Sequence, residues 1–346
     1  MSKILITNFC GWGNAIMEWP LLQELGRAGH TFFHVDNALF TDHDLLRRAA
    51  LPGFEGLVPK DWRSFKKDCW ERIADFIDHK NITAVLNWRN EGPGFDVDYY
   101  GFKWWINKHR RKDISFFDIP FGASWDVLAS TNIRNGMWDA LSSAIGPLPQ
   151  NFDFTGGLDG LYSTDGAPSD AYFCINPNTS QRSKALPLGV WQSICESLLS
   201  ASPLKLLIIV GTSALERQTA EDLFTLLKLR YHSRIERFQS LDFDALLAAV
   251  AGSNGAVSLD TGLVHACTEL NVPCVGLYVS TSVAVWGGVK RFVGLQGSGY
   301  GQCADTKIHA GNCPHYYDGI CPAHSFLESD FDGELVASTL LNLQPK

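Results

Sequence analysis

Short apolar segments alternate with longer amphipathic ones along this chain, and this alternation constrains the fold more than any other feature. In the first half, strands are predicted at 3–7, 31–35 and 83–88, with a helix between the first two that ends near Gly29. In the second half, strands are expected at 171–175, 205–210, 255–259 and 275–278. Helices are expected at 188–199, 214–229 and 242–251. Strands that alternate with helices build parallel sheets, so we predict two Rossmann-like α/β domains, with ligands at the carboxyl ends of the strands and between the domains.

The boundary between the two domains is predicted from local composition. The segment 147–168 is rich in Gly, Pro, Asp and Ser and has no sustained periodicity, which is typical of a linker. We therefore expect one domain at 1–150, a linker at 151–168, a second domain at 169–327 and a C-terminal helix within 328–346.

Composition excludes several classes of protein. The net charge of −8 over 346 residues argues against a nucleic-acid binder that relies on bulk charge. No apolar run reaches the roughly 18 residues of a membrane span, and the chain opens directly on a strand without the apolar core of a signal peptide. The first six of the nine cysteines are scattered through strands, helices and loops, which favours a reducing cytoplasm over a disulfide framework.

The segment from Ser258 to Cys267 has the most informative local pattern. It reads as the end of a buried strand, an acidic turn and a helix. Asp260, with Thr261 behind it, can cap that helix, and Gly262 permits close approach, so amide donors and the positive helix end face the turn. His265 lies one turn on, on the same helix face as Thr261. We predict a nucleotide-binding turn; the alternative is an ordinary capped helix with a core histidine.

Aromatic residues are concentrated in the first half, which holds nine of the eleven tryptophans. The run 103–112 combines two of these tryptophans with five lysines and arginines. Such a run could grip an anionic acceptor or contact an anionic membrane surface. The alternative is a solvated helix face whose tryptophans are buried in the core.

Four segments, in order, carry a resemblance to a known family. They are an opening strand, glycine loop and helix with an internal proline (4–22), a strand, Thr/Ser-Lys loop and Trp-containing helix (175–191), a strand–Gly–Glu-Arg segment (206–217) and the turn described above with its continuation (258–281). Together they resemble glycosyltransferase family 9, the heptosyltransferases of GT-B fold. The order and spacing of these segments hold across most of the chain.

The resemblance implies a fold and an activity. It implies two Rossmann-like domains that face a central cleft, with the acceptor bound by 1–150, the nucleotide sugar bound by 169–327 and the C-terminal helix packed back on the N-terminal domain. The implied reaction is inverting, needs no cofactor or metal, and moves a sugar, heptose favoured, from a donor such as ADP-heptose to a hydroxyl of a saccharide, protein or small molecule. The enzyme would be cytoplasmic, with a peripheral position at the inner membrane left open, as is its oligomeric state.

Donor-binding residues are carried over where the sequence matches the family. Lys184 resembles the lysine that contacts the donor phosphates, where a flexible cation suits a leaving diphosphate; the alternative is a surface lysine. Thr179 and Ser180 match hydroxyl positions near the same phosphates. The full donor set is Thr179, Ser180, Arg182, Lys184, Gly211, Glu216, Asp260, Thr261, Gly262, His265 and Thr281.

The catalytic base is where the sequence departs from the family. The family's glycine loop ends in Gly-Asp, and that aspartate is thought to deprotonate the acceptor, whereas this chain has Asn14, an amide that is no useful base. Glu18 lies one helical turn on and is our candidate for a displaced base, with Asn14 and Lys184 as the other catalytic candidates. The alternatives are a solvated Glu18, a base among Asp36, Glu91, Asp96 and Asp98, or a protein that has lost catalysis.

Two further sets of residues complete the expectations. The acceptor-binding candidates are Trp12, Gly13, Asn14, Arg89 and Asn90. A possible structural zinc or iron site is Cys303, Cys313, Cys321 and His324, although the spacing lacks CxxC pairs and free thiols are the alternative.

Two rival functions stay open: an inactive sugar-nucleotide binder, suggested by Asn14, and a GT-B sugar-nucleotide epimerase. A dinucleotide oxidoreductase is disfavoured, because Ile16 stands where a third glycine is expected.

Overall fold

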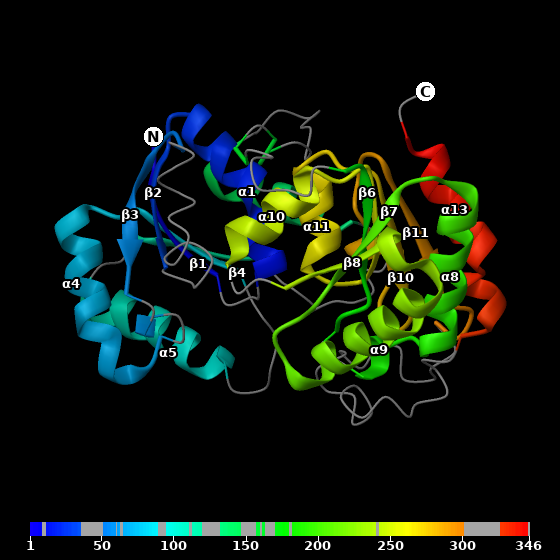
Figure 1. Cartoon of the computed structure of the whole chain (residues 1–346). Helices are drawn as coiled ribbons and strands as arrows, with labels where there is room; N and C mark the ends of the chain where they lie inside the picture. Colours follow the sequence, from blue (N-terminus) through cyan, green and yellow to red (C-terminus); the bar gives the residue numbers. More distant parts are fainter. Residues whose placement is uncertain are drawn as a thin grey trace. The chain divides into compact units, whose positions relative to one another are not determined.

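The chain forms two compact units, Met1–Phe154 and Thr155–Lys346, which we describe separately (Figure 1). The computed structural model describes residues 1–8, 12–35, 51–59, 61–62, 65–88, 95–110, 113–119, 132–146, 157–159, 161–162, 170–179, 182–239, 242–300 and 326–344. Each unit is an α/β domain built on its own parallel sheet, which confirms the predicted fold class.

The N-terminal sheet has five parallel strands in the order β3-β2-β1-β4-β5. The strands are β1 (Lys3–Asn8), β2 (Thr31–Val35), β3 (Phe54–Val58), β4 (Ala84–Trp88) and β5 (Ser115–Ile119). The described helices are α1 (Trp12–Arg27), α4 (Trp70–Lys80), α5 (Phe95–His109) and α7 (Ile133–Ile145), with a short 3-10 turn, η2, at Lys67–Cys69. The sequence predicts β1, β2 and β4. It misses β3, because only Val58 of that strand is fully buried and the hydrophobic pattern is weak.

One face of the N-terminal sheet is covered by α4 and α5 (Figure 1). Every third or fourth residue of α5 is apolar and buried, at Tyr99, Phe102 and Ile106, and this spacing places them along one side of the helix. The strand residues beneath these helices are Leu5, Phe33, Val35, Val58 and Val85. Burial of a large apolar side chain contributes about 1.5–3 kcal/mol, so this layer fixes both helices on the sheet.

The C-terminal sheet has six parallel strands in the order β11-β10-β9-β6-β7-β8. The strands are β6 (Tyr172–Asn176), β7 (Lys205–Ile209), β8 (Ile235–Phe238), β9 (Gly255–Leu259), β10 (Cys274–Tyr278) and β11 (Phe292–Gln296). The helices are α8 (Leu188–Ala201), α9 (Ala214–Tyr231), α10 (Phe243–Ala251), α11 (Gly262–Glu269), α12 (Val283–Trp286) and α13 (Gly333–Asn342). Three 3-10 turns are η3 (Arg182–Lys184), η4 (His232–Arg234) and η7 (Glu328–Phe331). The central strands β6, β9 and β10 are buried along their whole length, as expected for a parallel sheet covered on both faces.

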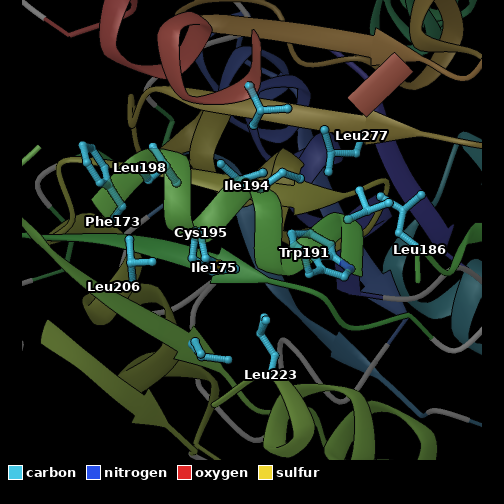
Figure 2. Close-up of a cluster of buried hydrophobic side chains, with 14 of the residues drawn as sticks. Phe173, Ile175, Leu186, Trp191, Ile194, Cys195, Leu198, Leu206, Leu223 and Leu277 are labelled. Carbon is cyan, nitrogen blue, oxygen red and sulfur yellow. The ribbon is translucent and has the colours of Figure 1, made fainter. Parts of the chain in front are cut away.

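The main core of this unit lies between the sheet and α8 (Figure 2). Trp191, Ile194 and Leu198 of α8 face alternate strand residues such as Phe173 and Ile175. On the opposite face of β6, the hydroxyl of Tyr172 donates to the carbonyl of Ala249 in α10 at 2.6 Å. The sheet is therefore held between two helical layers.

The C-terminal helix packs within its own unit. α13 contacts α8, β9 and β10, where Val336 and Leu340 join the core, and its packing on the N-terminal domain stays a prediction. Gly333 permits this approach, since a Cβ there would lie 2.5 Å from the carbonyl oxygen of Ser193 in α8. The helix thus completes the layer formed by α8.

Part of the predicted linker also packs on the C-terminal unit. The amide of Leu158 donates to the carbonyl of Glu269 at the end of α11, at 3.1 Å, and the Leu158 side chain is fully buried. The amide of Gly157 donates to the Glu269 carboxylate at 3.3 Å. These contacts attach the chain to α11 directly after the boundary between the units.

No described helix is both long and apolar enough to cross a membrane.

Candidate functional site

The polar residues of the C-terminal unit gather where its strands end. Asn176 ends β6, Gly211 follows β7, Asp260 follows β9 and Thr281 follows β10. Because β10, β9, β6 and β7 are neighbours in a parallel sheet, their carboxyl ends meet at one edge. That edge is where α/β proteins bind ligands, and most of the predicted donor residues lie there.

Lys184, Asp260 and Thr281 form a tight charged cluster at this edge. The Lys184 ammonium lies 2.7 Å from Oδ2 of Asp260, and the Thr281 hydroxyl donates to the same oxygen at 2.5 Å. The side chain of Lys184 is 15% exposed and that of Asp260 only 6%. Lys184 is therefore not an ordinary surface lysine, because its charge is held beside the turn by a buried carboxylate.

This cluster controls the ionisation of Asp260. Burial alone would raise the pKa of the carboxyl, but the Lys184 ammonium and hydrogen bonds from Lys184 and Thr281 outweigh burial, with a further contribution from His265. The pKa of Asp260 is therefore lowered, and the group is an anion at neutral pH. Asp260 in turn keeps a cation at the sheet edge.

The helix that follows is capped by Thr261 rather than by Asp260. The Thr261 hydroxyl accepts a hydrogen bond from the amide of Leu263 at 3.4 Å, while the Asp260 carboxylate turns toward Lys184. The expectation that Asp260 caps α11 is thus wrong, because the ammonium competes successfully for its carboxylate. The positive end of α11, at Gly262, nevertheless lies next to Lys184, and the two together favour an anion.

Two buried asparagines, which the sequence analysis misses, connect the strand ends beneath this turn. Nδ2 of Asn176 donates to the hydroxyls of Ser258 at 2.9 Å and Thr261 at 3.0 Å. Nδ2 of Asn178 donates to Oδ1 of Asn176 and to the carbonyl of Ile209, both at 2.8 Å. The signal that could have found them is an Asn-Pro-Asn sequence directly after a buried strand, since buried amides need partners.

Gln296 of β11 supports the loop that carries Thr281, and it too was missed. Its amide nitrogen donates to the carbonyls of Tyr278 and Thr281 at 3.0 Å, and its oxygen accepts from the amide of Val283 at 3.0 Å. One side chain thereby holds both ends of the β10–α12 connection. An isolated glutamine carries no sequence signal for such a role.

Gly211 and Glu216 form a local packing unit at the start of α9. The Glu216 carboxylate accepts from the amide of Ser213 at 2.9 Å, and the Ser213 hydroxyl accepts from the amide of Glu216 at 3.3 Å, which is a capping box. A Cβ at Gly211 would lie 2.5 Å from Cβ of Glu216. Helix capping therefore accounts for these residues, and a contact with the donor remains a prediction.

The remaining donor candidates are placed as follows. Thr179 and His265 are buried, with 5% and 4% exposure, and Arg182 is exposed in η3 next to Lys184. His265 lies in α11, one turn beyond Thr261, as predicted. Ser180 lies outside the described residues.

In the N-terminal unit, Glu18 is buried and paired. Both Glu18 of α1 and His34 of β2 are fully buried, with Oε2 of Glu18 3.1 Å from Nε2 of His34. Nδ1 of His34 lies 2.7 Å from the carbonyl of Val35, which can only accept, so the network assigns a proton to Nδ1. A general base must reach its substrate, so this geometry favours a positioning role for Glu18 over direct proton abstraction and excludes the solvated reading.

The other predicted residues of this unit are described only in part. Trp12, Gly13 and Asn14 form the first turn of α1, but the side chains of Trp12 and Asn14 lie outside the described part, as do Arg89 and Asn90. Among the alternative bases, Asp98 of α5 is partly buried, whereas Asp36, Glu91 and the side chain of Asp96 are not described.

The proposed metal ligands Cys303, Cys313, Cys321 and His324 also lie outside the described residues. Within the described ranges, no group of three or more His, Cys, Asp or Glu side chains could hold a metal ion.

The two parallel-sheet α/β domains, of five and six strands, match the GT-B fold of solved heptosyltransferase structures. Residues 158–311, within the C-terminal unit, match the family model of glycosyltransferase family 9 (heptosyltransferase). This match confirms the resemblance predicted from the sequence and with it the class of enzyme, a glycosyltransferase. A comparison with curated protein sequences finds no match.

Solved structures show the same fold over the whole chain. A glycosyltransferase family 9 structure from Veillonella parvula has a TM-score of 0.68 at 16% identity and covers 99% of this chain and 98% of its own. The ADP-heptose lps heptosyltransferase II of E. coli has a TM-score of 0.63 at 14% identity, with 99% of each chain covered. The E. coli heptosyltransferase WaaC with ADP has a TM-score of 0.60 at 18% identity, covering 85% of this chain and 93% of its own.

Proposed function

We propose that this protein transfers a sugar from a nucleoside-diphosphate sugar to a hydroxyl acceptor, with the donor diphosphate bound at the carboxyl edge of the C-terminal sheet. The observation that carries the proposal is the Lys184–Asp260 pair beside the first turn of α11. A held ammonium next to a helix amino end provides two sources of positive charge for an anion. The family 9 match over the same residues supports this use of the site.

Lys184 would exchange partners when the donor binds. In the structure its ammonium contacts Oδ2 and, at 3.3 Å, the backbone carbonyl of Asp260. A diphosphate carries more charge than one carboxylate, so the flexible lysine would turn toward the phosphates while Asp260 limits its range of motion. The arrangement would then stabilise the charge that develops on the leaving diphosphate.

We propose an inverting single displacement for the chemical step. The acceptor oxygen attacks the anomeric carbon, the bond from that carbon to the diphosphate oxygen breaks, and the acceptor proton passes to a base. Lys184, the amides of α11 and the hydroxyls of Thr179 and Ser180 would supply the electrostatic stabilisation, so the reaction would need no metal ion. The acceptor would bind the N-terminal unit near Trp12, Gly13, Asn14, Arg89 and Asn90.

The general base that deprotonates the acceptor is proposed to be a residue other than Glu18. Glu18 is buried against His34, and Asn14 can bind the acceptor but cannot accept its proton. The candidates that remain from the sequence are Asp36, Glu91, Asp96 and Asp98. Glu18 would act indirectly, by fixing the register of α1 and thus the position of Asn14.

ADP-heptose is the donor we favour. The family is described by its heptosyltransferase activity, and the WaaC structure of the same fold is named as binding ADP. The specific observation in favour of a second function, an inactive sugar-nucleotide binder, is that Asn14 occupies the expected base position and Glu18 is buried. The family match favours transfer over the epimerase alternative.

A two-stage experiment separates these functions. Thermal unfolding is measured with ADP, UDP, GDP and ADP-heptose; binding at 100 times Kd stabilises a protein by about 2.7 kcal/mol, which raises Tm measurably. ADP release from the best donor is then followed with saccharide, protein and small-molecule acceptors. We expect stabilisation by ADP and ADP-heptose and acceptor-dependent release of ADP. Stabilisation without turnover supports the inactive binder, and no stabilisation by any nucleotide contradicts both functions.

A further inference from the structure

Helix α5 of the N-terminal unit has two aromatic faces, of which only one is buried. Tyr99, Phe102 and Ile106 are 2% exposed or less and pack on the sheet. Trp104 points the other way and is 61% exposed, and Tyr100, one turn before it, is 42% exposed. A lone exposed aromatic needs no explanation, but a tryptophan and a tyrosine one turn apart place two exposed rings on the same side of the helix, which we call the exposed strip of α5.

The exposed strip of α5 is surrounded by positive charge. The Lys108 ammonium lies 4.6 Å from the centre of the Trp104 ring, which places a cation one turn beyond the tryptophan on the same face. Lys108, His109 and Arg110 are exposed at the end of the helix. From Gly101 to Lys112 the sequence has five lysines and arginines and no acidic residue.

Acidic residues beside the basic run offset part of its positive charge. Asp75 of α4 pairs with Arg110 at 3.2 Å and Asp113 follows Lys112 in the chain, whereas Asp98 lies near the start of α5, away from the basic end. The rest of the molecule is acidic, because the whole chain has a net charge of −8. A local basic face on an acidic protein indicates a specific anionic partner rather than general attraction to polyanions.

We propose that the exposed face of α5, formed by Tyr100, Trp104 and Lys108, is a docking surface for an anionic lipid bilayer. Tryptophan and tyrosine favour the depth of the lipid headgroups, where the ring is apolar on its faces and can donate a hydrogen bond at its edge. Lysines beside them contact anionic headgroups, each contributing modestly and additively. The helix would lie along the membrane surface, with its buried face still on the sheet. This proposal does not depend on the identity of the sugar donor.

The test is co-sedimentation of the full chain with vesicles. Vesicles of phosphatidylglycerol and phosphatidylcholine in equal amounts are compared with vesicles of phosphatidylcholine alone, at low and high salt. We expect binding to the anionic vesicles that weakens with salt, since exposed charges are screened. Trp104→Ser should weaken the partition coefficient about tenfold, and Lys108→Glu at least about fivefold.

Matched controls separate this surface from general surface properties. Leu229→Ser removes an apolar side chain that is 75% exposed on α9, and Arg27→Glu reverses a charge that is 60% exposed on α1. Both controls should bind vesicles like the original protein, and all four variants should keep its Tm. Equal binding to both vesicle types, or equal loss in the controls and in the α5 variants, would overturn the proposal. Retention on an anionic polysaccharide column without vesicle binding would also overturn it, in favour of a soluble polyanion.

Discussion

The Lys184 ammonium lies 2.7 Å from the carboxylate of Asp260, where a loop after β6 meets the turn after β9. The two residues are far apart in sequence, yet they form an ion pair at the carboxyl edge of the C-terminal sheet. The amino end of α11 lies at the same edge. Thr281 donates to the same carboxylate oxygen from a third strand end. A single buried carboxylate thus joins three segments that carry predicted donor residues, and its removal should affect stability and nucleotide binding together.

Stability should depend on pH through Asp260. Its pKa is lowered in the folded protein, so its contribution is fully present above the ordinary pKa of the unfolded chain, about 3.9. That contribution is lost as pH falls through the lower folded value. We predict that urea unfolding shows a larger loss of stability below about pH 4 for the wild type than for Asp260→Asn. Identical profiles for the two proteins would mean that the carboxylate is not held by Lys184 in solution.

Lys184→Ala should lower both turnover and stability. Loss of one preorganised positive group at a transition state typically costs about 10²–10³-fold in rate. The change also leaves the Asp260 carboxylate buried without its cation, so Tm should fall. Turnover is measured as ADP release, with Lys184→Arg as the conservative control that retains charge. Wild-type turnover in Lys184→Ala would remove Lys184 from the reaction.

Asn176→Ala should weaken nucleotide binding although Asn176 lies beneath the site. The variant removes the hydrogen bonds from Asn176 to Ser258 and Thr261 and the one that Asn176 accepts from Asn178, at a cost of about 1–3 kcal/mol for buried groups left unpaired. The cap of α11 loses support, so we expect Kd for ADP to rise roughly tenfold, equivalent to about 1.4 kcal/mol. Calorimetric titration measures this effect. The control Gln218→Ala, which removes an exposed amide on α9, should leave Kd for ADP unchanged. Equal ADP affinity in the two variants would show that Asn176 has only a structural role.

Glu18→Ala should destabilise the N-terminal unit by about 3–5 kcal/mol, because it leaves His34 without its partner in a dry environment. The double variant Glu18→Ala/His34→Ala should lose less than the sum of the single variants, because the two residues are in contact. Urea unfolding of the four proteins gives the coupling. Donor binding to the C-terminal unit should persist in Glu18→Gln. Additive losses would contradict a direct interaction.

The parallel sheets could be predicted because local patterns specify them. Continuous apolar runs such as those of β6 and β9 are typical of strands buried on both faces, and the turn at Asp260 follows from its place after such a strand. The cluster around Lys184 was predicted only as separate residues. Asp260 pairs with Lys184 instead of capping α11 because the folded chain places the Lys184 ammonium beside its carboxylate. Sequence alone does not show this tertiary contact.

Features set by tertiary packing could not be read from the sequence. Glu18 lies one turn after Asn14 as predicted, but only the position of His34 on β2 decides that it is buried rather than available to an acceptor. The partner of α13 depends in the same way on Gly333, whose small size lets the helix approach α8. Gln296 was missed because a lone amide has the same sequence signature on a surface as in a buried network, whereas Asn176 carried a signal in the Asn-Pro-Asn sequence at the end of β6.

The central claim is that the edge at Lys184 and Asp260 binds the diphosphate of a nucleotide, and calorimetric titration of ADP tests it most directly. The account predicts that ADP binds the wild type, that Lys184→Ala weakens binding by about tenfold or more, and that Arg230→Ala, which removes an exposed cation on α9, leaves the affinity unchanged. Equal affinity for ADP in the wild type and Lys184→Ala, or no binding to either, would contradict it.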